Sequence, residues 1–293
     1  MATIRTPAVA GQFYESDQHA LLESIRSCFT DERGPQSIPE IKEGKQNPRG
    51  IVVPHAGYPA SGSIAAHAYH YLASNGFADT FIILGPNHTG MGSGVSIMTE
   101  GGWKTPLGIV PINESTATKL QKDIIDNDEV AHIYEHSIEV QLPFLQFLAN
   151  GKSFDFVPIC MGMQDVQTSQ EVGGIIADVI KKSEQRICIV ASSDFSHAGF
   201  NYQSMPPTGT RVNTYCEQQD KLAIEKILEM DVEGLIYTVH KHHITMCGYG
   251  PVATMIVAAK KLGATTAELL KYGSSYEVYP GGSCVGYGAI AVY

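Results

Sequence analysis

The chain has 293 residues, of which 43% are hydrophobic and 17% charged, and its formal net charge is -10. This apolar content with few charges is typical of a globular protein with a sizeable core and argues against intrinsic disorder. The acidic balance argues against nucleic acid and anionic membrane as partners, because both need a basic surface.

The N-terminal stretch MATIRTPAVAGQFYESD lacks the apolar region of a signal peptide. No stretch of the sequence reaches the roughly 18 apolar residues that a membrane-spanning helix needs. We therefore expect a soluble, cytoplasmic protein. The 6 cysteines are scattered and form no CxxC pair. This spacing predicts buried free thiols rather than a disulfide framework or a zinc ribbon.

The predicted elements alternate between strands and helices. After a first helix, the charged, proline-containing segment 31–50 is expected to be a surface loop before the first core strand. The runs 81–84 and 187–190 are apolar without alternation, as in strands covered on both faces. The predicted strands are 50–53, 80–84, 95–98, 154–159, 187–191, 266–272 and 285–293, and the predicted helices are 17–29, 62–74, 114–126, 137–149, 168–183, 210–230, 231–240 and 248–262.

This alternation predicts an α/β fold in a single domain over residues 1–293, with a central mixed, mostly parallel sheet flanked by helices. In such sheets, sites form at the carboxyl ends of the strands. Three predicted strands run into polar turns there: PHAGY with His55, GPNHTG with His88 and SSDFSH with His197. One histidine at a strand end is usually a capping or core residue, but three coincidences favour a shared site.

Two further segments carry reactive side chains. Cys247 precedes a predicted helix, and a helix N-terminus tends to lower a thiol pKa. This predicts a metal ligand or a nucleophile, the alternative being a small buried thiol in a tight turn. The nearby His240, His242 and His243 are expected in a solvated turn.

In EHSIEVQLPFLQFL (135–148), Glu135 and Glu139 are expected one helical turn apart, with His136 beside them. They are either helix N-terminal acids favoured by the dipole or part of a pocket. The HExxH metalloprotease pattern is absent from this segment. Tyr58 is a further candidate for lining a pocket, with a place in the core as the alternative.

Two imidazoles and a thiolate or carboxylate form a ligand set suited to iron, copper or zinc. The candidates are His55, His88 and Cys247, with Asp194 as an additional or alternative oxygen ligand. His197 would then be a general acid or base beside the metal ion. A coordination position left open to substrate would make such a site catalytic.

Several of these motifs occur together, in order, in a known family. The stretches TPAVAGQFY (6–14), PHAGYPASG (54–62), LGPNH (84–88), TPLG (105–108), EHSIEVQLPFL (135–145), SSDFSH (192–197) and TMCG (245–248) span nearly the whole chain. In combination they resemble the Memo family, and the match is far more specific than any one motif.

The resemblance implies a fold similar to that of class III extradiol dioxygenases. It implies that His55 and His88 are metal ligands, that His197 is the catalytic histidine, and that Asp194 takes part in metal binding. Cys247 stands where the dioxygenases supply a glutamate ligand. Animal members are tied to cell motility and receptor signalling, with copper or iron binding and redox activity proposed. Microbial members are associated with AMMECR1-like and radical-SAM proteins, which are therefore partners implied by the resemblance.

A thiolate in place of a carboxylate raises the affinity of the site for Cu(I) or zinc. It also puts an oxidisable group beside any bound dioxygen. Ser196 stands where some relatives have cysteine. Three functions stay open. The first is a metal-dependent oxidoreductase of unknown substrate. The second is a non-enzymatic ligand- or peptide-binding protein on a dioxygenase-like fold. The third is a metal-free hydrolase with Cys247 as nucleophile and His197 as base.

Overall fold

The computed structural model describes residues 3–42 and 48–293. Its central sheet is built around the parallel strands β2, β9, β3 and β8, which are neighbours in that order. Nearly all their residues are buried because helices cover both faces of the sheet, which explains the apolar runs without alternation. These strands are β2 (Gly50–Val53), β3 (Thr80–Pro86), β8 (Asp155–Met161) and β9 (Ile187–Ser192).

Antiparallel strands border this parallel core on both sides. β12 pairs with β2 and also with β10 and β11, while β4 pairs with β8 on the other side and β7 follows β4 in parallel. These strands are β4 (Val95–Ile97), β7 (Asp126–Asn127), β10 (His197–Gly199), β11 (Ala267–Ser274) and β12 (Ser283–Val292). A small separate sheet contains β1 (Ile4–Arg5), β5 (Gly102–Thr105) and β6 (Gly108–Pro111).

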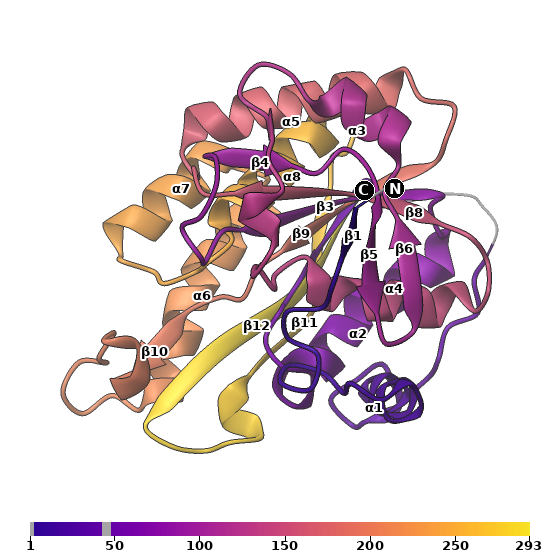
Figure 1. The fold of residues 1–293 in the computed structure, drawn as a ribbon. Coiled ribbons are helices and arrows are strands. Elements are labelled where there is room, and N and C mark those ends of the chain that lie inside the picture. Colours follow the sequence, from indigo (N-terminus) through magenta and orange to yellow (C-terminus); the bar gives the residue numbers. More distant parts are fainter. Residues whose placement is uncertain (1–2, 43–47) are drawn as a thin grey trace.

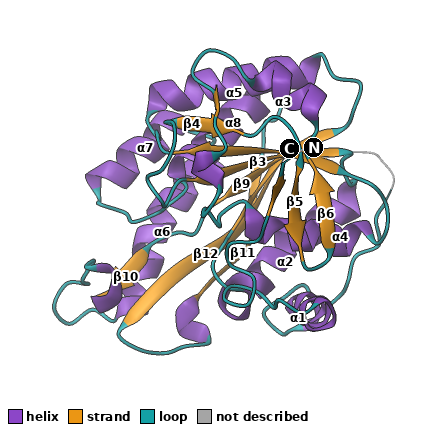
Figure 2. Cartoon of the chain, in the orientation of Figure 1, coloured by secondary structure: helices purple, strands orange, loops and turns teal. Residues whose placement is uncertain are grey.

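The helices form layers on the two faces of the central sheet (Figures 1 and 2). α1, α2 and α4 cover one face, and α3, α5, α7 and α8 cover the other, with α6 packed against β10 and β12. The helices are α1 (Gln18–Thr30), α2 (Tyr58–Asn75), α3 (Glu114–Leu120), α4 (Leu142–Ala149), α5 (Val166–Lys181), α6 (Val212–Leu228), α7 (Val232–Lys241) and α8 (Tyr249–Lys261). The predicted α/β class, a mixed sheet flanked by helices, is confirmed.

Two helix boundaries differ from the prediction in ways that shape the site. α2 begins at Tyr58 rather than at residue 62, because Pro59 is well accommodated in the first turn of a helix. α4 begins only at Leu142, after a 3-10 turn over Glu139–Gln141, so the predicted helix over 137–149 is too long. Glu135 and His136 lie outside any helix, and the expected one-turn spacing of Glu135 and Glu139 is wrong.

Other differences are smaller. α3 ends at Leu120 rather than near residue 126, and the short strands β1, β5, β6, β7 and β10 were not predicted. Over residues 31–42 the predicted loop contains turns and bends but no helix or strand, and residues 43–47 of that prediction lie outside the described part. None of the helices in the described ranges combines the length and apolar character that crossing a bilayer requires.

Candidate metal centre

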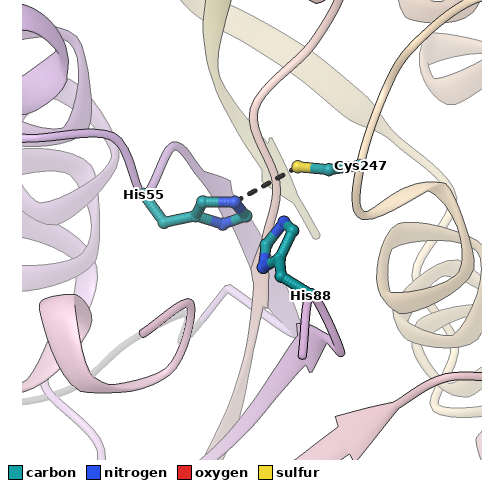
Figure 3. Close-up of side chains that lie close together, drawn as sticks. All are labelled: His55, His88 and Cys247. Carbon is teal, nitrogen blue, oxygen red and sulfur yellow. Dashed lines mark hydrogen bonds between the residues drawn. The ribbon is translucent and has the colours of Figure 1, made fainter. Parts of the chain in front are cut away.

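Two histidines and a cysteine converge beyond the carboxyl ends of the parallel strands (Figure 3). His55 is the second residue after β2, His88 the second after β3, and Cys247 lies just before α8. The ring centroids of His55 and His88 are 5.2 Å apart, and Cys247 Sγ lies 3.2 Å from His55 Nε2. One ligand atom from each residue lies within 4.8 Å of the others. The predicted convergence of the His55 and His88 turns is therefore present, with Cys247 as the third member of the group.

Hydrogen bonds determine the tautomer of the buried His55. Its Nδ1 lies 2.9 Å from Ser192 Oγ, which donates its only hydrogen to the carbonyl oxygen of Ser137 at 2.6 Å. Ser192 Oγ also accepts a hydrogen bond from Gln141 Nε2 at 2.8 Å. Because the serine hydrogen is already used, His55 Nδ1 must be the donor. The Nε2 lone pair therefore faces Cys247.

His88 is oriented by the buried Glu135. One carboxylate oxygen accepts the backbone N–H of His88 at 2.6 Å, and the other lies 3.0 Å from His88 Nδ1. Burial opposes ionisation of Glu135, but His88 and the Ser137 N–H outweigh it and lower the pKa to about 2. An ionised carboxylate only accepts, so Nδ1 of His88 carries a hydrogen, and in the neutral ring Nε2 keeps its lone pair. A carboxylate behind an imidazole is a common arrangement around metal ions.

The sulfur of Cys247 lies 3.2 Å from His55 Nε2 and 3.6 Å from the carbonyl oxygen of Asp194, so its one thiol hydrogen has two acceptors within reach. The helix N-terminus predicted a lowered pKa, and this expectation is wrong. Burial of the sulfur, followed by the nearby carboxylate of Asp194, raises the pKa of the thiol. Gly248 allows this turn to sit on the end of β9, since a Cβ there would lie 2.5 Å from the carbonyl oxygen of Ser192.

Asp194 contacts the backbone of the turn that carries His55. Its Oδ1 accepts the backbone N–H of His55 at 2.8 Å and that of Ala56 at 3.3 Å, so it fixes the turn after β2. In the described residues, Asp194 does not belong to the group formed by His55, His88 and Cys247. Its contacts in this structure therefore position a candidate ligand.

His197 is held by Thr245, two residues before Cys247. Thr245 Oγ1 accepts the backbone N–H of His197 at 2.7 Å and donates to its carbonyl oxygen at 2.8 Å. The ring Nδ1 faces the carbonyl oxygens of Phe195 and Thr245 at 3.0 and 3.1 Å. Carbonyl oxygens only accept, so Nδ1 carries the hydrogen and Nε2 is a free acceptor. His197 is also close enough to contribute to the pKa of His55, which burial and then its histidine neighbours lower.

His136 completes the cluster of imidazoles. Its ring stacks on His88 at a centroid distance of 4.7 Å and meets the edge of His55 at 5.4 Å. Burial lowers its pKa to about 4, which keeps it neutral at neutral pH. With His88 and Glu135 it forms a second group of candidate ligand atoms that shares His88 with the first.

The other two candidate pocket residues lie in the protein interior. Tyr58 packs against Tyr14 and Phe144 and donates to the carbonyl oxygen of Val140 at 2.7 Å. The carboxylate of Glu139 accepts hydrogen bonds from the N-terminal segment, including Arg5 at 2.6 Å. These contacts therefore join α2 and the N-terminal segment to residues 139–140.

Two features lie away from the cluster. His240, His242 and His243 are exposed, as predicted, although His240 lies in the last turn of α7 rather than in the turn that follows it. A cavity of about 1050 Å³ lies between α1, α4 and residues 38–41, and none of the clustered histidines lines it. The candidate site is therefore identified by its donor atoms and not by the volume of a cavity.

The positioning residues Ser192, Gln141 and Thr245 were not predicted from the sequence. Ser192 and Thr245 are in the quoted SSDFSH and TMCG motifs, and Gln141 is in EHSIEVQLPFL. Their presence in these motifs was the signal in the sequence that could have identified them as site residues. Their roles depend on contacts between residues far apart in the chain, such as Gln141 with Ser192, which no local pattern indicates.

Fold and site together define an α/β protein whose parallel strands present two histidines beside a cysteine. A family model described as Memo-like protein matches residues 5–291. MEMO1 family proteins from Methanopyrus kandleri, Methanococcus maripaludis strain C5 and Methanosarcina barkeri are similar, at 46%, 47% and 45% identity. The matches cover 98%, 98% and 99% of this chain and 98%, 99% and 100% of the relatives. The chain therefore belongs to the Memo family.

Proposed function

We propose that this protein binds a redox-active transition metal ion, iron or copper, through His55, His88 and Cys247 and acts as an oxidoreductase on a substrate still to be identified. One observation carries the proposal. In both histidines Nδ1 is committed to an acceptor, so both Nε2 lone pairs are available next to a thiol. Two imidazoles and a sulfur ligand suit iron, copper or zinc.

The donor set fits a metal ion on physical grounds. The sulfur of Cys247 lies 3.2 Å from His55 Nε2, whose lone pair faces it, so a cation held by both atoms would take the place of the thiol proton. His88 is the more open ligand, with 33% of its side chain exposed, which gives an ion or substrate access from solvent.

A bound iron or copper ion would supply electron transfer and a coordination position for substrate. The surrounding residues would orient and deprotonate that substrate. His197 offers Nε2 as a proton acceptor, because its Nδ1–H is held by backbone carbonyl oxygens. A metal-free hydrolase fits less well, because the thiol of Cys247 bonds to His55 rather than to His197 and burial raises its pKa.

A metal inventory of protein purified without oxygen tests the proposal. We expect about one iron or copper ion per chain in the wild type, and loss of that ion in Cys247→Ser. Cys188→Ser is the matched control, because Cys188 is a fully buried thiol in β9 outside the ligand group. Equal metal content in wild type and Cys247→Ser would contradict the assigned ligands.

The same preparation separates the oxidoreductase from a non-enzymatic binding protein. A loaded protein that is reduced by ascorbate and reoxidised by air supports redox chemistry at the site. A protein that holds only zinc, or no ion above background, would favour a ligand- or peptide-binding role on the same fold.

A further inference from the structure

A pair of cysteines lies behind His197, in a small apolar cluster separate from the main core. This cluster contains Ala198 of β10, Val212 and Cys216 of α6, and Cys284 of β12. Ala198 and Cys284 are paired in the sheet, and Val212 and Cys216 are one turn apart on the helix. Both cysteines are fully buried and reduced. Their side chains therefore meet where α6 packs on β12 and β10, in the corner at the lower left of Figure 1.

The contacts of Cys216 show how close the two residues are. Its Sγ lies 3.3 Å from the carbonyl oxygen of Cys284. Its thiol also interacts with the thiol of Cys284, which raises the pKa of Cys216 and lowers that of Cys284. Cys284 is therefore the more readily ionised member of the pair, and thiolates are the species that oxidants attack.

The helix that carries Cys216 also holds the residue before His197. Cys216 Sγ lies 3.4 Å from the carbonyl oxygen of Ser196 and 3.3 Å from that of Cys284, so its one hydrogen is shared between these two acceptors. Asp220, one turn further along α6, accepts the Ser196 N–H at 2.7 Å. Both backbone polar groups of Ser196 thus contact α6, and its carbonyl oxygen also accepts the N–H of Gly286 in β12 at 2.9 Å. A change in the position of α6 would therefore be transmitted to the turn that aims His197.

We propose that Cys216 and Cys284 are a disulfide-forming pair whose oxidation changes the conformation of the His197 turn. A peroxide is the class of oxidant. The Cys284 thiolate attacks one peroxide oxygen and becomes a sulfenic acid, and the first water is released. The Cys216 sulfur then displaces the second water as the S–S bond forms. Two thiols and one hydrogen peroxide thus give one disulfide and two waters.

The link to His197 follows from geometry. A disulfide requires a sulfur–sulfur distance of about 2.05 Å, well inside the contact distance of unbonded sulfur atoms, so the side chains of Cys216 and Cys284 must move closer together. Oxidation also removes the S–H donor from the carbonyl oxygen of Ser196. Both changes act on the turn before His197 without touching His55 or His88. The inference does not depend on a metal ion being bound.

Peptide mapping of the folded, full-length protein tests the bond. After treatment with hydrogen peroxide and alkylation of free thiols, the protein is digested with trypsin without reduction. The 6 cysteines fall on different tryptic peptides, with Cys216 in 212–221 and Cys284 in 272–293. We expect these two peptides to be joined, with a mass lower than their sum by two hydrogens, and the Cys188→Ala control to behave alike. Linkage that appears only after denaturation would overturn the proposal.

Ring NMR signals of histidine test the coupling. The His197 signal is assigned by its absence in His197→Gln, and spectra are recorded on metal-free protein before and after oxidation. We expect the His197 signal to shift on oxidation, to return with dithiothreitol, and to stay unchanged in Cys284→Ala. A joined peptide pair with an unmoved His197 signal would refute the coupling. Neither measurement depends on metal binding. A negative result here is therefore distinguishable from failure of the proposed metal-dependent function.

Discussion

Ser192→Ala would expose how much of the candidate site depends on the tautomer of His55. The Ser192 hydroxyl lies 2.9 Å from His55 Nδ1 and 2.6 Å from the carbonyl oxygen of Ser137. Its removal leaves three buried groups without this partner: the donors His55 Nδ1 and Gln141 Nε2 and the acceptor Ser137 carbonyl oxygen. Each such group costs about 1–3 kcal/mol, so we expect the free energy of unfolding to fall by about 3–9 kcal/mol.

Metal affinity should fall as well, because His55 loses the bond that keeps its Nε2 lone pair toward the ligand group. Removal of such an outer partner typically lowers metal affinity about 10–100-fold, or about 1.4–2.8 kcal/mol. Competition with a chelating dye measures this loss. Ser96→Ala is the matched control, because Ser96 is fully buried in β4 and donates one hydrogen bond to the carbonyl oxygen of Ser93 at 3.0 Å. Equal metal affinity in the two variants would refute the reasoning.

Four other variants probe charges. Glu135→Gln should weaken metal binding about tenfold or more in the same dye competition, since an amide orients an imidazole less strongly than a carboxylate. Arg5→Met leaves the carboxylate of Glu139 buried without its cation and should cost about 3–5 kcal/mol in urea unfolding. Arg26→Met, at an exposed pair, should cost under about 1 kcal/mol. Burial raises the pKa of Asp220 to about 6. The folded state therefore binds this proton more tightly than the unfolded state, and stability falls by about 2 kcal/mol from pH 4 to 6 and by about 3 kcal/mol over the whole titration. In Asp220→Asn this part of the pH dependence should vanish, and an unchanged profile would contradict the assignment.

The sequence was most informative where one physical constraint acts over a whole segment. β2, β3 and β9 were predicted because strands covered on both faces must be apolar at every position. The turns after them follow from the parallel arrangement, which brings all carboxyl ends to one edge. The proximity of His55 to His88 was predictable for this reason.

The segment 135–141 was predicted wrongly because its polar groups bond to distant residues. The pattern of EHSIEVQL favours a helix from residue 137, but the Glu135 carboxylate accepts the N–H groups of His136, Ser137 and His88. Gly85 lets this segment cross the end of β3, since a Cβ there would lie 2.4 Å from Ser137 Oγ. Periodicity describes one element at a time, so it does not detect such bonds.

The pKa of Cys247 shows a similar limit in electrostatics. A helix N-terminus stabilises a thiolate by a modest interaction, whereas burial beside a carboxylate penalises it more strongly. Only the three-dimensional structure shows which of the two dominates.

The turns of Cys247 and His197 form one connected unit. Thr245 bonds both backbone groups of His197, and its own carbonyl oxygen faces the His197 ring. A shift of either turn must therefore strain the other, unlike two loops joined only through solvent. His55 is connected to the same unit through the Cys247 thiol and through Asp194, which fixes its backbone. Cys247 and His197 thus keep their relative positions because Thr245, two residues before Cys247 in the chain, bonds to the backbone of His197.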